Sequence, residues 1–166
     1  MTVYHFKYAP TSIKFEVKLN GTSIIPVTLL EKSIFKHQTN IDGTFTHQQS
    51  GSSVQIPKDS LLDWYGNAYS GNFTLEVAFL DMKNKKSWMG MPDGFIGFQA
   101  NKSVVFETFN AIHIDLRSES GSALHIKSGS YMNVSIKVGS TDLGSATYFW
   151  EYQNGKWISV SQINSN

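Results

Sequence analysis

Apolar and polar residues alternate over several segments of the chain, and this period of two is the pattern of strands that bury one face. The clearest segments are residues 13–19, 72–80, 111–116 and 131–138. In residues 13–19 every second residue is apolar, and charged residues fill the positions between them. A helix would instead repeat its apolar positions every three or four residues. These segments therefore predict β-strands.

A hairpin is predicted near the end of the sequence, with strands over residues 147–153 and 156–160. Between them lies Asn154-Gly155, a pair that readily adopts the positive φ angles of a two-residue hairpin turn. Only residues 58–64 favour a short helix, with Asp59 or Ser60 as its cap. Further strand candidates are less regular: residues 24–30, 43–49, 53–56, 104–109 and 123–126.

About eight to ten short strands without intervening helices are typical of a β-sandwich or a β-barrel. A chain of 166 residues has the size of one domain and can bury a core that needs no disulfides, and it contains no cysteine. We therefore predict an all-β fold, with residues 1–166 forming a single domain. The longest stretch without a strand pattern, residues 81–102, is too long for an ordinary hairpin loop.

The segment 53–77 contains an Ile-Pro pair, a Leu, an Asp, a Gly-Asn turn and a Gly ahead of an alternating strand. These residues are Ile56-Pro57, Leu61, Asp63, Gly66-Asn67 and Gly71. In this order they resemble a β-sandwich module of surface and secreted proteins of Bacteroidetes-type bacteria. Similar segments occur in the extracellular parts of the astroprincin and cartilage intermediate layer protein families.

The resemblance extends over residues 43–162, with Met91-Pro92 similar to a Met-Pro pair that follows the module's long loop. It implies an immunoglobulin-like antiparallel β-sandwich of about eight to ten strands. It also implies an exported, non-enzymatic accessory module within a longer protein, and it offers no catalytic residues. Residues 1–42 would then be an added N-terminal strand pair.

The charge of the chain is nearly balanced, with 14 basic and 13 acidic residues and a formal net charge of +1. Nucleic-acid binding normally requires a concentrated basic face, so no nucleic-acid partner is predicted. No stretch approaches the roughly 18 apolar residues of a spanning helix, so no membrane insertion is predicted. Residues 1–10 lack a signal-peptide pattern. The predicted location is extracellular or at the cell surface, as part of a longer exported protein; the alternative is cytoplasmic.

Residues that could carry catalysis or bind a metal are scattered. His113 and Asp115 share a predicted strand face, and His125 could lie opposite them, but we interpret all three as solvated polar residues. We therefore predict no metal site, no cofactor and no enzyme activity. No Gly-x-Ser-x-Gly nucleophile motif is present, and the carboxylates show no evident pair for glycoside hydrolysis. Asp63 and Asn67 are expected to cap a turn rather than to bind calcium.

Aromatic residues supply the candidate binding site. Trp88 lies in the long loop beside Lys85, Lys86, Met89 and Met91, and this group is predicted to contact a partner. The alternative is that Trp88 and Met91 close one end of the sandwich. Other aromatic residues could add to a stacking platform, although tryptophans in β-sandwiches are more often core residues. They are Trp64, Tyr65, Tyr148, Trp150, Tyr152 and Trp157.

Three functions follow from these observations. The first is a non-enzymatic module at the cell surface for protein interaction, adhesion or structural spacing. The second is a carbohydrate-binding module that uses exposed loop aromatics. The third, and least favoured, is a small hydrolase with a site at His113 and Asp115. The partner is accordingly predicted to be a protein or a glycan.

Overall fold

Every regular element that the structure describes is a β-strand, which confirms the predicted all-β class. The computed structural model describes residues 2–5, 8–12, 29–48, 50–81, 96–105, 110–137, 148–153 and 156–162. Within these residues no helix is long and apolar enough to span a membrane. The strands are β1 (Thr2–His5), β2 (Tyr8–Ser12), β3 (Leu30–Glu31), β4 (Ser33–Gln38), β5 (Gly43–Thr46), β6 (Ser53–Ile56), β7 (Leu61–Leu62), β8 (Asn72–Asp81), β9 (Ile96–Gln99), β10 (Lys102–Val105), β11 (Asn110–Ser118), β12 (His125–Ile126), β13 (Asn133–Ser135), β14 (Tyr148–Gln153) and β15 (Lys156–Gln162).

The chain divides into two compact units, each assembled from segments that are distant in sequence. Unit 1 comprises Met1–Leu30, Leu80–Ala111 and Gly139–Asn166. Unit 2 comprises Glu31–Phe79 and Ile112–Val138.

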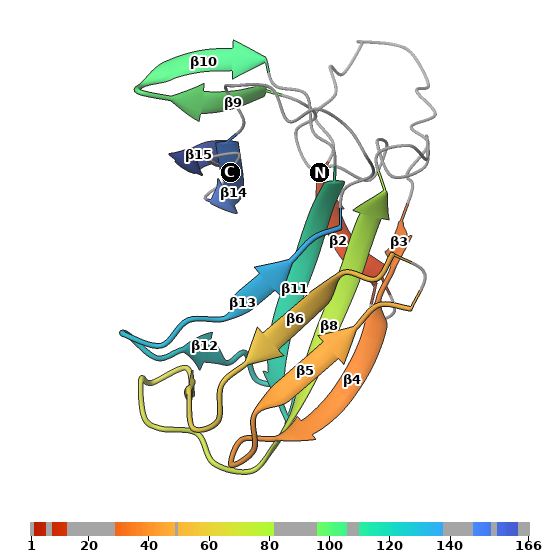
Figure 1. Cartoon of the computed structure of the whole chain (residues 1–166), viewed down its shortest axis with the longest axis vertical. Coiled ribbons are helices and arrows are strands. Elements are labelled where there is room, and N and C mark those ends of the chain that lie inside the picture. The colour runs from red at the N-terminus through yellow and green to blue at the C-terminus, as the bar shows by residue number, and fades with distance from the viewer. Residues whose placement is uncertain are drawn as a thin grey trace, which may run out of the picture. The chain divides into compact units, whose positions relative to one another are not determined.

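Unit 2 contains two three-stranded sheets, in the orders β11-β8-β4 and β13-β6-β5, and the two-stranded sheet β12-β7. Figure 1 shows β5, β6 and β13 lying across β4, β8 and β11. One apolar core joins them, because its buried residues come from both three-stranded sheets and from β7. These residues are Phe45, Val54, Ile56, Leu61, Phe73, Leu75, Val77, Leu116 and Leu124.

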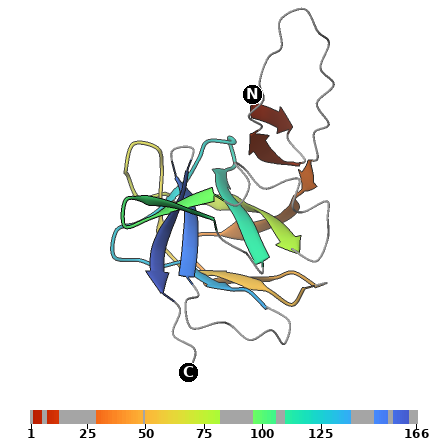
Figure 2. The same ribbon diagram turned by 90° about the horizontal axis from the view of Figure 1, so that it is seen from above.

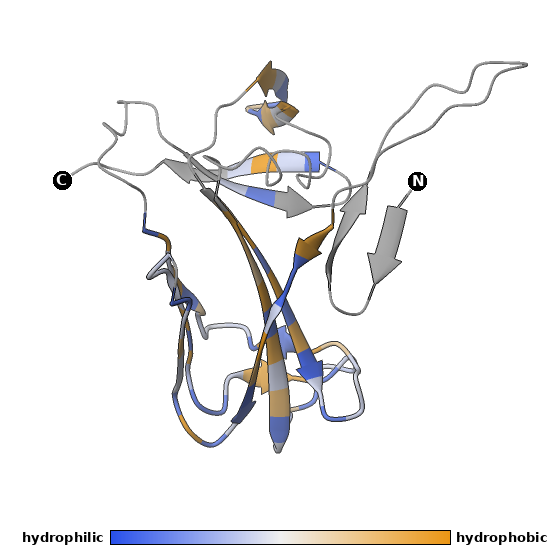
Figure 3. Ribbon diagram, turned by 90° about the vertical axis from the view of Figure 1, so that its right-hand side faces the viewer, coloured by the Kyte–Doolittle hydropathy of each residue, from blue (hydrophilic) through white to orange (hydrophobic). Residues whose placement is uncertain are grey.

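Strand β8 illustrates why the alternation predicts its structure. Phe73, Leu75 and Val77 are buried in the core, while Thr74 and Glu76, which lie between them in the sequence, are only half-buried. Successive side chains of a strand point to opposite faces, so this sequence can cover one core and present polar groups on the other side. The long strands in Figure 3 show the same alternation of hydrophobic and hydrophilic residues.

Unit 1 contains a four-stranded sheet in the order β10-β9-β15-β14. Strands β14 and β15 form an antiparallel pair (Figure 2), whereas β15 runs parallel to β9, with Trp157 opposite Gly97. Trp157 packs with Leu30 and Ala111 against the buried Leu80, which forms a small separate apolar cluster. Strands β1, β2 and β3 form another sheet, in that order.

Several predicted strands agree with the structure, whereas the strand predicted over residues 131–138 is limited to Asn133–Ser135 within the described residues. Strand β8 covers residues 72–80, β11 covers residues 111–116, and β6 occupies residues 53–56 as predicted. Strands β14 and β15 form the predicted hairpin, although its Asn154-Gly155 turn lies outside the described residues. Residues 13–19 and most of the candidate 24–30 also lie outside them.

The predicted helix over residues 58–64 is wrong. Asp59 has a φ of 54°, outside the right-handed helical region, and Leu61–Leu62 form β7. Strand β7 pairs with β12, and Leu61 is buried in the core of unit 2. Core burial of Leu61 and cross-strand pairing outweigh the weak helical signal.

Five strands were not predicted as strands: β1, β2, β4, β7 and β9. In β4 the half-buried positions are Ser33, Phe35 and His37. Because Ser33 and His37 are polar, the sequence of this strand does not show an alternation of apolar and polar residues. Strand β9 and Lys102, the first residue of β10, lie within the stretch 81–102 that was predicted to be a loop. Strand β10 begins at Lys102, two residues before the predicted segment 104–109, and is described as far as Val105. Residues 106–109 and 82–95 lie outside the described part of the chain.

Candidate functional site

Two large aromatic side chains lie exposed at the surface of unit 2, directly after β7. Trp64 is 69% exposed and Tyr65 is 86% exposed. Their loop, residues 63–67, is part of the yellow segment near β12 in Figure 1. Tryptophan and tyrosine are usually largely covered in folded proteins, and exposed aromatic groups often mark contact sites. We refer to residues 63–67 as the aromatic loop.

The aromatic loop is held by the side chain of Asp63. Its Oδ1 atom accepts hydrogen bonds from the backbone N–H groups of Tyr65, at 2.9 Å, and Asn67, at 2.8 Å. Its Oδ2 atom accepts one from Nδ2 of Asn67, at 3.2 Å. These hydrogen bonds hold the pKa of Asp63 below its ordinary value, and the hydrogen bond from the Asn67 backbone N–H has the largest effect. Asp63 and Asn67 therefore cap a turn, as predicted.

Backbone geometry completes the loop. The Asp63 N–H donates to the carbonyl of Asn67 at 2.9 Å, and the Gly66 N–H donates to the carbonyl of Asp63 at 3.1 Å. Gly66 has a φ of 85°, a left-handed conformation that glycine adopts without strain. Because both ends of the turn are hydrogen-bonded to each other, Trp64 and Tyr65 are presented by an ordered backbone.

His125 lies beside Trp64 although 61 positions separate them in the sequence. The pairing of β12 with β7 places His125 opposite Leu62 and Ile126 opposite Leu61. The ring centroids of Trp64 and His125 are 5.6 Å apart, and the two ring planes are inclined by 43°. His125 is also exposed. The surface therefore combines a flat apolar ring with a polar ring at its side.

The charges on the two segments that form this surface cancel. In residues 57–70 and 125–131 the charged side chains are Lys58, Asp59, Asp63 and Lys127, two of each sign. A groove for single-stranded nucleic acid combines stacking aromatics with excess positive charge. The balanced charge here favours a neutral ligand.

A second polar group lies on the outer face of sheet β11-β8-β4. Ile112, Ile114 and Leu116 contact the core, so His113 and Asp115 occupy the other face of β11, as predicted. Nε of Arg117 donates to Oδ2 of Asp115 at 3.1 Å. Lys32 and Glu76 form an ion pair. The carboxylates of Asp115 and Glu76 are thus each paired with a cationic side chain.

This polar face does not gather the ligands of a metal ion. Among the described residues no group of three or more His, Asp or Glu side chains could hold one. The interpretation of His113 as a solvated residue is wrong, because its Nε2 atom is buried and has no hydrogen-bond partner within the described part of the chain. His125, considered as a third member of such a group, lies beside Trp64 instead.

Burial of the half-buried His113 imidazole lowers its pKa; the nearby Asp115 carboxylate opposes this effect and the Lys32 ammonium adds to it. The unfolded chain, whose histidines titrate near 6.5, therefore binds a proton before the folded protein does. Stability contributed by neutral His113 is complete above about pH 6.5 and is lost as the pH falls towards the lowered pKa. Between pH 7.5 and 5.5, urea unfolding should show a smaller loss of stability for His113→Gln than for the native protein. Equal losses in both proteins would contradict this prediction.

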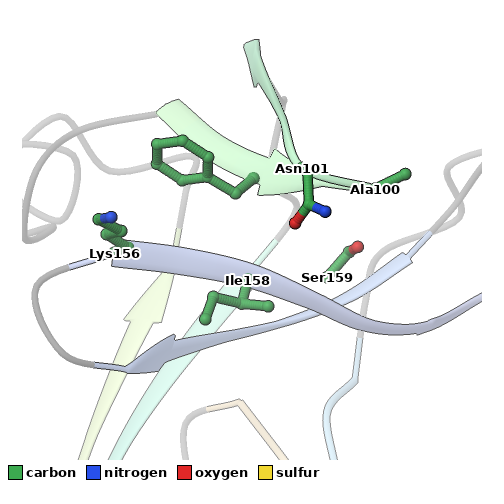
Figure 4. Close-up of a pocket in the computed structure, with 6 residues that line it drawn as sticks. Ala100, Asn101, Lys156, Ile158 and Ser159 are labelled. Carbon is green, nitrogen blue, oxygen red and sulfur yellow. The ribbon is translucent and has the colours of Figure 1, made fainter.

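Unit 1 contains a shallow cavity of about 300 Å³ between the β9–β10 turn and β15 (Figure 4). Nζ of Lys156 lies 5.0 Å from the centroid of the Phe98 ring, a cation–π contact that covers one wall. Asn101 and Ser159 supply the other polar groups, with Ala100 and Ile158 beside them. The cavity lacks a buried, directed polar group and is a less developed site than the aromatic loop.

The predicted site residues have different outcomes. Lys85, Lys86, Trp88, Met89 and Met91 all lie outside the described residues, so their contact surface stays a prediction. Of the other aromatic candidates, Trp150 and Trp157 are half-buried, and Tyr148 and Tyr152 belong to β14. Trp64 and Tyr65 are the candidates that the structure places at the surface.

Sequence analysis did not select His125 as a neighbour of Trp64, nor the exposed Tyr131. The pairing of two-residue strands β7 and β12 brings His125 to its place, and such short strands leave almost no periodic signal.

Comparisons of the chain with protein-family models, with curated proteins and with solved structures gave no match.

Proposed function

We propose that this chain is a non-enzymatic carbohydrate-binding module and that the aromatic loop contacts the glycan. The observation that carries the proposal is the exposure of Trp64 and Tyr65 on a loop that is itself hydrogen-bonded at both ends. The module is further proposed to be an immunoglobulin-like sandwich of about eight to ten strands within one domain, at the cell surface or outside the cell.

Leaving these side chains exposed has an energetic cost that binding would offset. Burying a large apolar side chain contributes roughly 1.5–3 kcal/mol to stability. The fold gives up this contribution at Trp64 and Tyr65 while holding their backbone in place. Rigid aromatic side chains give a large contact area at a low cost in conformational entropy. They are therefore suited to binding a small ligand.

The polar surroundings of the exposed rings favour a sugar over a protein at this place. A stable protein interface buries about 800 Å² on each partner around an apolar centre. Here the exposed rings are flanked by the polar residues Asp63, Asn67, His125 and Lys127. A pyranose has one apolar C–H face and a rim of hydroxyl groups, which match a ring surrounded by polar side chains.

A protein partner is a second candidate function, supported by a different surface. Ile96 and Val105 lie directly opposite each other in the β9–β10 hairpin, and both are exposed. In the order β10-β9-β15-β14, β10 is at an edge of its sheet. An exposed apolar pair at a strand edge is a feature that protein interaction or adhesion could use.

The carbohydrate proposal is tested with a glycan array probed with the native protein and with Trp64→Ala. We expect binding to at least one neutral glycan and a loss of at least about tenfold in affinity for the variant. Because Trp64 is exposed, its replacement should change stability by less than about 0.5 kcal/mol. Val105→Ala, which alters an exposed side chain of unit 1, should bind like the native protein. An array without binding, or equal binding by Trp64→Ala, would refute the proposed site.

A further inference from the structure

We infer that Trp64 and His125 form a subsite for a single neutral pyranose ring. In this subsite Trp64 stacks on the C–H face of the sugar, and His125 hydrogen-bonds a hydroxyl group at the edge of the same ring. His125 is thereby the residue that selects among sugars that differ in the orientation of one hydroxyl. This inference rests on the proposed carbohydrate-binding function and identifies the ligand of that site.

The relative orientation of the two rings leaves room for a ligand. Stacked aromatic rings lie nearly parallel and cover each other's faces. Trp64 and His125 are instead inclined by 43° with centroids 5.6 Å apart, and Trp64 remains 69% exposed. Most of the indole therefore presents a surface to solvent, although the tilted imidazole lies close to it. A sugar stacked on the exposed part of the indole would come within reach of the imidazole.

The chemistry of the imidazole fits a hydroxyl group. Neutral histidine has one ring nitrogen that donates a hydrogen bond and one that accepts. Within the described part of the chain, no hydrogen bond engages the ring nitrogens of His125, and its ring lies against Trp64. A sugar hydroxyl both donates and accepts, so either ring nitrogen can bind it. The other histidines of unit 2 with side-chain hydrogen bonds, His37 and His47, already use a ring nitrogen within the fold.

Both residues are held in place before a ligand binds. Trp64 follows Asp63, whose carboxylate fixes the turn. His125 belongs to β12, and the next backbone groups are also tied down: the Lys127 N–H donates to the carbonyl of Ser60 at 2.7 Å, and the Leu124 N–H to that of Leu116 at 2.9 Å. A pre-organised pair loses little conformational entropy on binding, which raises affinity for a ligand as small as one sugar ring.

The charge around the subsite identifies the class of sugar. Lys58, Asp59, Asp63 and Lys127 balance each other on the two segments that form it. A charged uronic or sialic acid would meet no excess of positive charge there. The subsite is therefore assigned to neutral hexopyranoses.

The test compares the native protein with Trp64→Ala, His125→Phe and His125→Gln by titration calorimetry. The ligands are short neutral oligosaccharides that end in glucose, galactose or mannose; galactose and mannose each differ from glucose in the orientation of one hydroxyl group. Phenylalanine keeps an aromatic ring but removes both nitrogens, whereas glutamine keeps a donor and an acceptor. We expect His125→Phe to weaken binding of the preferred sugar by about tenfold, the effect of one lost hydrogen bond. It should also bring the affinities for the three sugars close together, and His125→Gln should retain part of the preference.

The outcomes separate this inference from the function on which it rests. If the native protein binds a glycan on the array but none of these sugars, the proposed function stands and the subsite is wrong; if it binds neither, both are wrong. If Trp64→Ala abolishes binding while His125→Phe keeps the native affinity and the native order of sugars, the binding function stands and the role of His125 is refuted. If acidic sugars bind more tightly than neutral ones, the assigned class is refuted. Circular dichroism of each variant checks that the β-structure is retained.

Discussion

Replacing Lys32 by methionine is expected to destabilise the protein by about 3–5 kcal/mol. The side chains of Lys32 and Glu76 are only 7% and 16% exposed, and they form an ion pair across β8 and the segment before β4. Removal of one partner leaves the other charge buried without compensation, and this is the costly case for a buried pair. Urea unfolding at neutral pH, followed by fluorescence, measures the change in free energy of unfolding.

The double variant Lys32→Met with Glu76→Leu is the matched control. Removing both charges eliminates the desolvation cost together with the attraction, so such replacements are often neutral or stabilising. We therefore expect the double variant to recover most of the stability that Lys32→Met loses. A loss below about 1 kcal/mol for Lys32→Met would instead indicate a pair that behaves like a solvent-exposed one. A double variant as unstable as the single one would show that packing, not charge, is what Lys32 supplies.

The second large effect is expected from Leu75→Ala in β8. Leu75 is fully buried and lies in the core shared by the two three-stranded sheets of unit 2. Truncation of a buried leucine removes apolar contacts and leaves a cavity, and this costs about 2–5 kcal/mol depending on how far the neighbours relax. A lowered midpoint of thermal unfolding and a matching decrease in urea stability would both be measured.

Val105→Ala gives the contrast for Leu75→Ala. It also truncates an aliphatic side chain in a strand, but Val105 is 84% exposed, so its effect should stay within about 0.5 kcal/mol. If Leu75→Ala were as mild as Val105→Ala, the core of unit 2 could not be packed as described. Because the chain has two units, coincident transitions by fluorescence and circular dichroism are needed before one free energy is assigned to it.

The parts of the fold that were predicted are those where one face of a strand is apolar without interruption. Strand β8 has Phe73, Leu75 and Val77 on one face, so its alternation is visible in the sequence alone. Strand β4 escapes the same analysis because His37 occupies a core-facing position. There it packs edge-on against Phe45 and Phe73, with ring centroids 5.4 and 5.8 Å away. The imidazole packs as an apolar ring would, but because histidine is counted as polar, the alternation of β4 is not visible in the sequence.

The candidate site was predictable only in its residue types. Trp64 and Tyr65 were among the aromatic candidates, but composition cannot distinguish an exposed tryptophan from a core one. Exposure depends on where the chain turns after β7, and the turn depends on Asp63 and Gly66. The position of His125 depends on the pairing between β7 and β12. Each of these strands is only two residues long, and the two are far apart in the sequence. Such long-range pairing is set by the core beneath it, through Leu61 and Leu124.

The parallel pairing of β15 with β9 has a consequence for the order of events on the ribosome. The second of the two segments of unit 2 ends at Val138, so this unit can be complete before β14 and β15 are synthesised. The β9–β10 hairpin, in contrast, emerges early and must wait for residues near Trp157 before its second edge is covered. During that interval the free edge of β9 can pair with another nascent chain. The interval between the synthesis of this hairpin and that of β15 is therefore a window for misassembly.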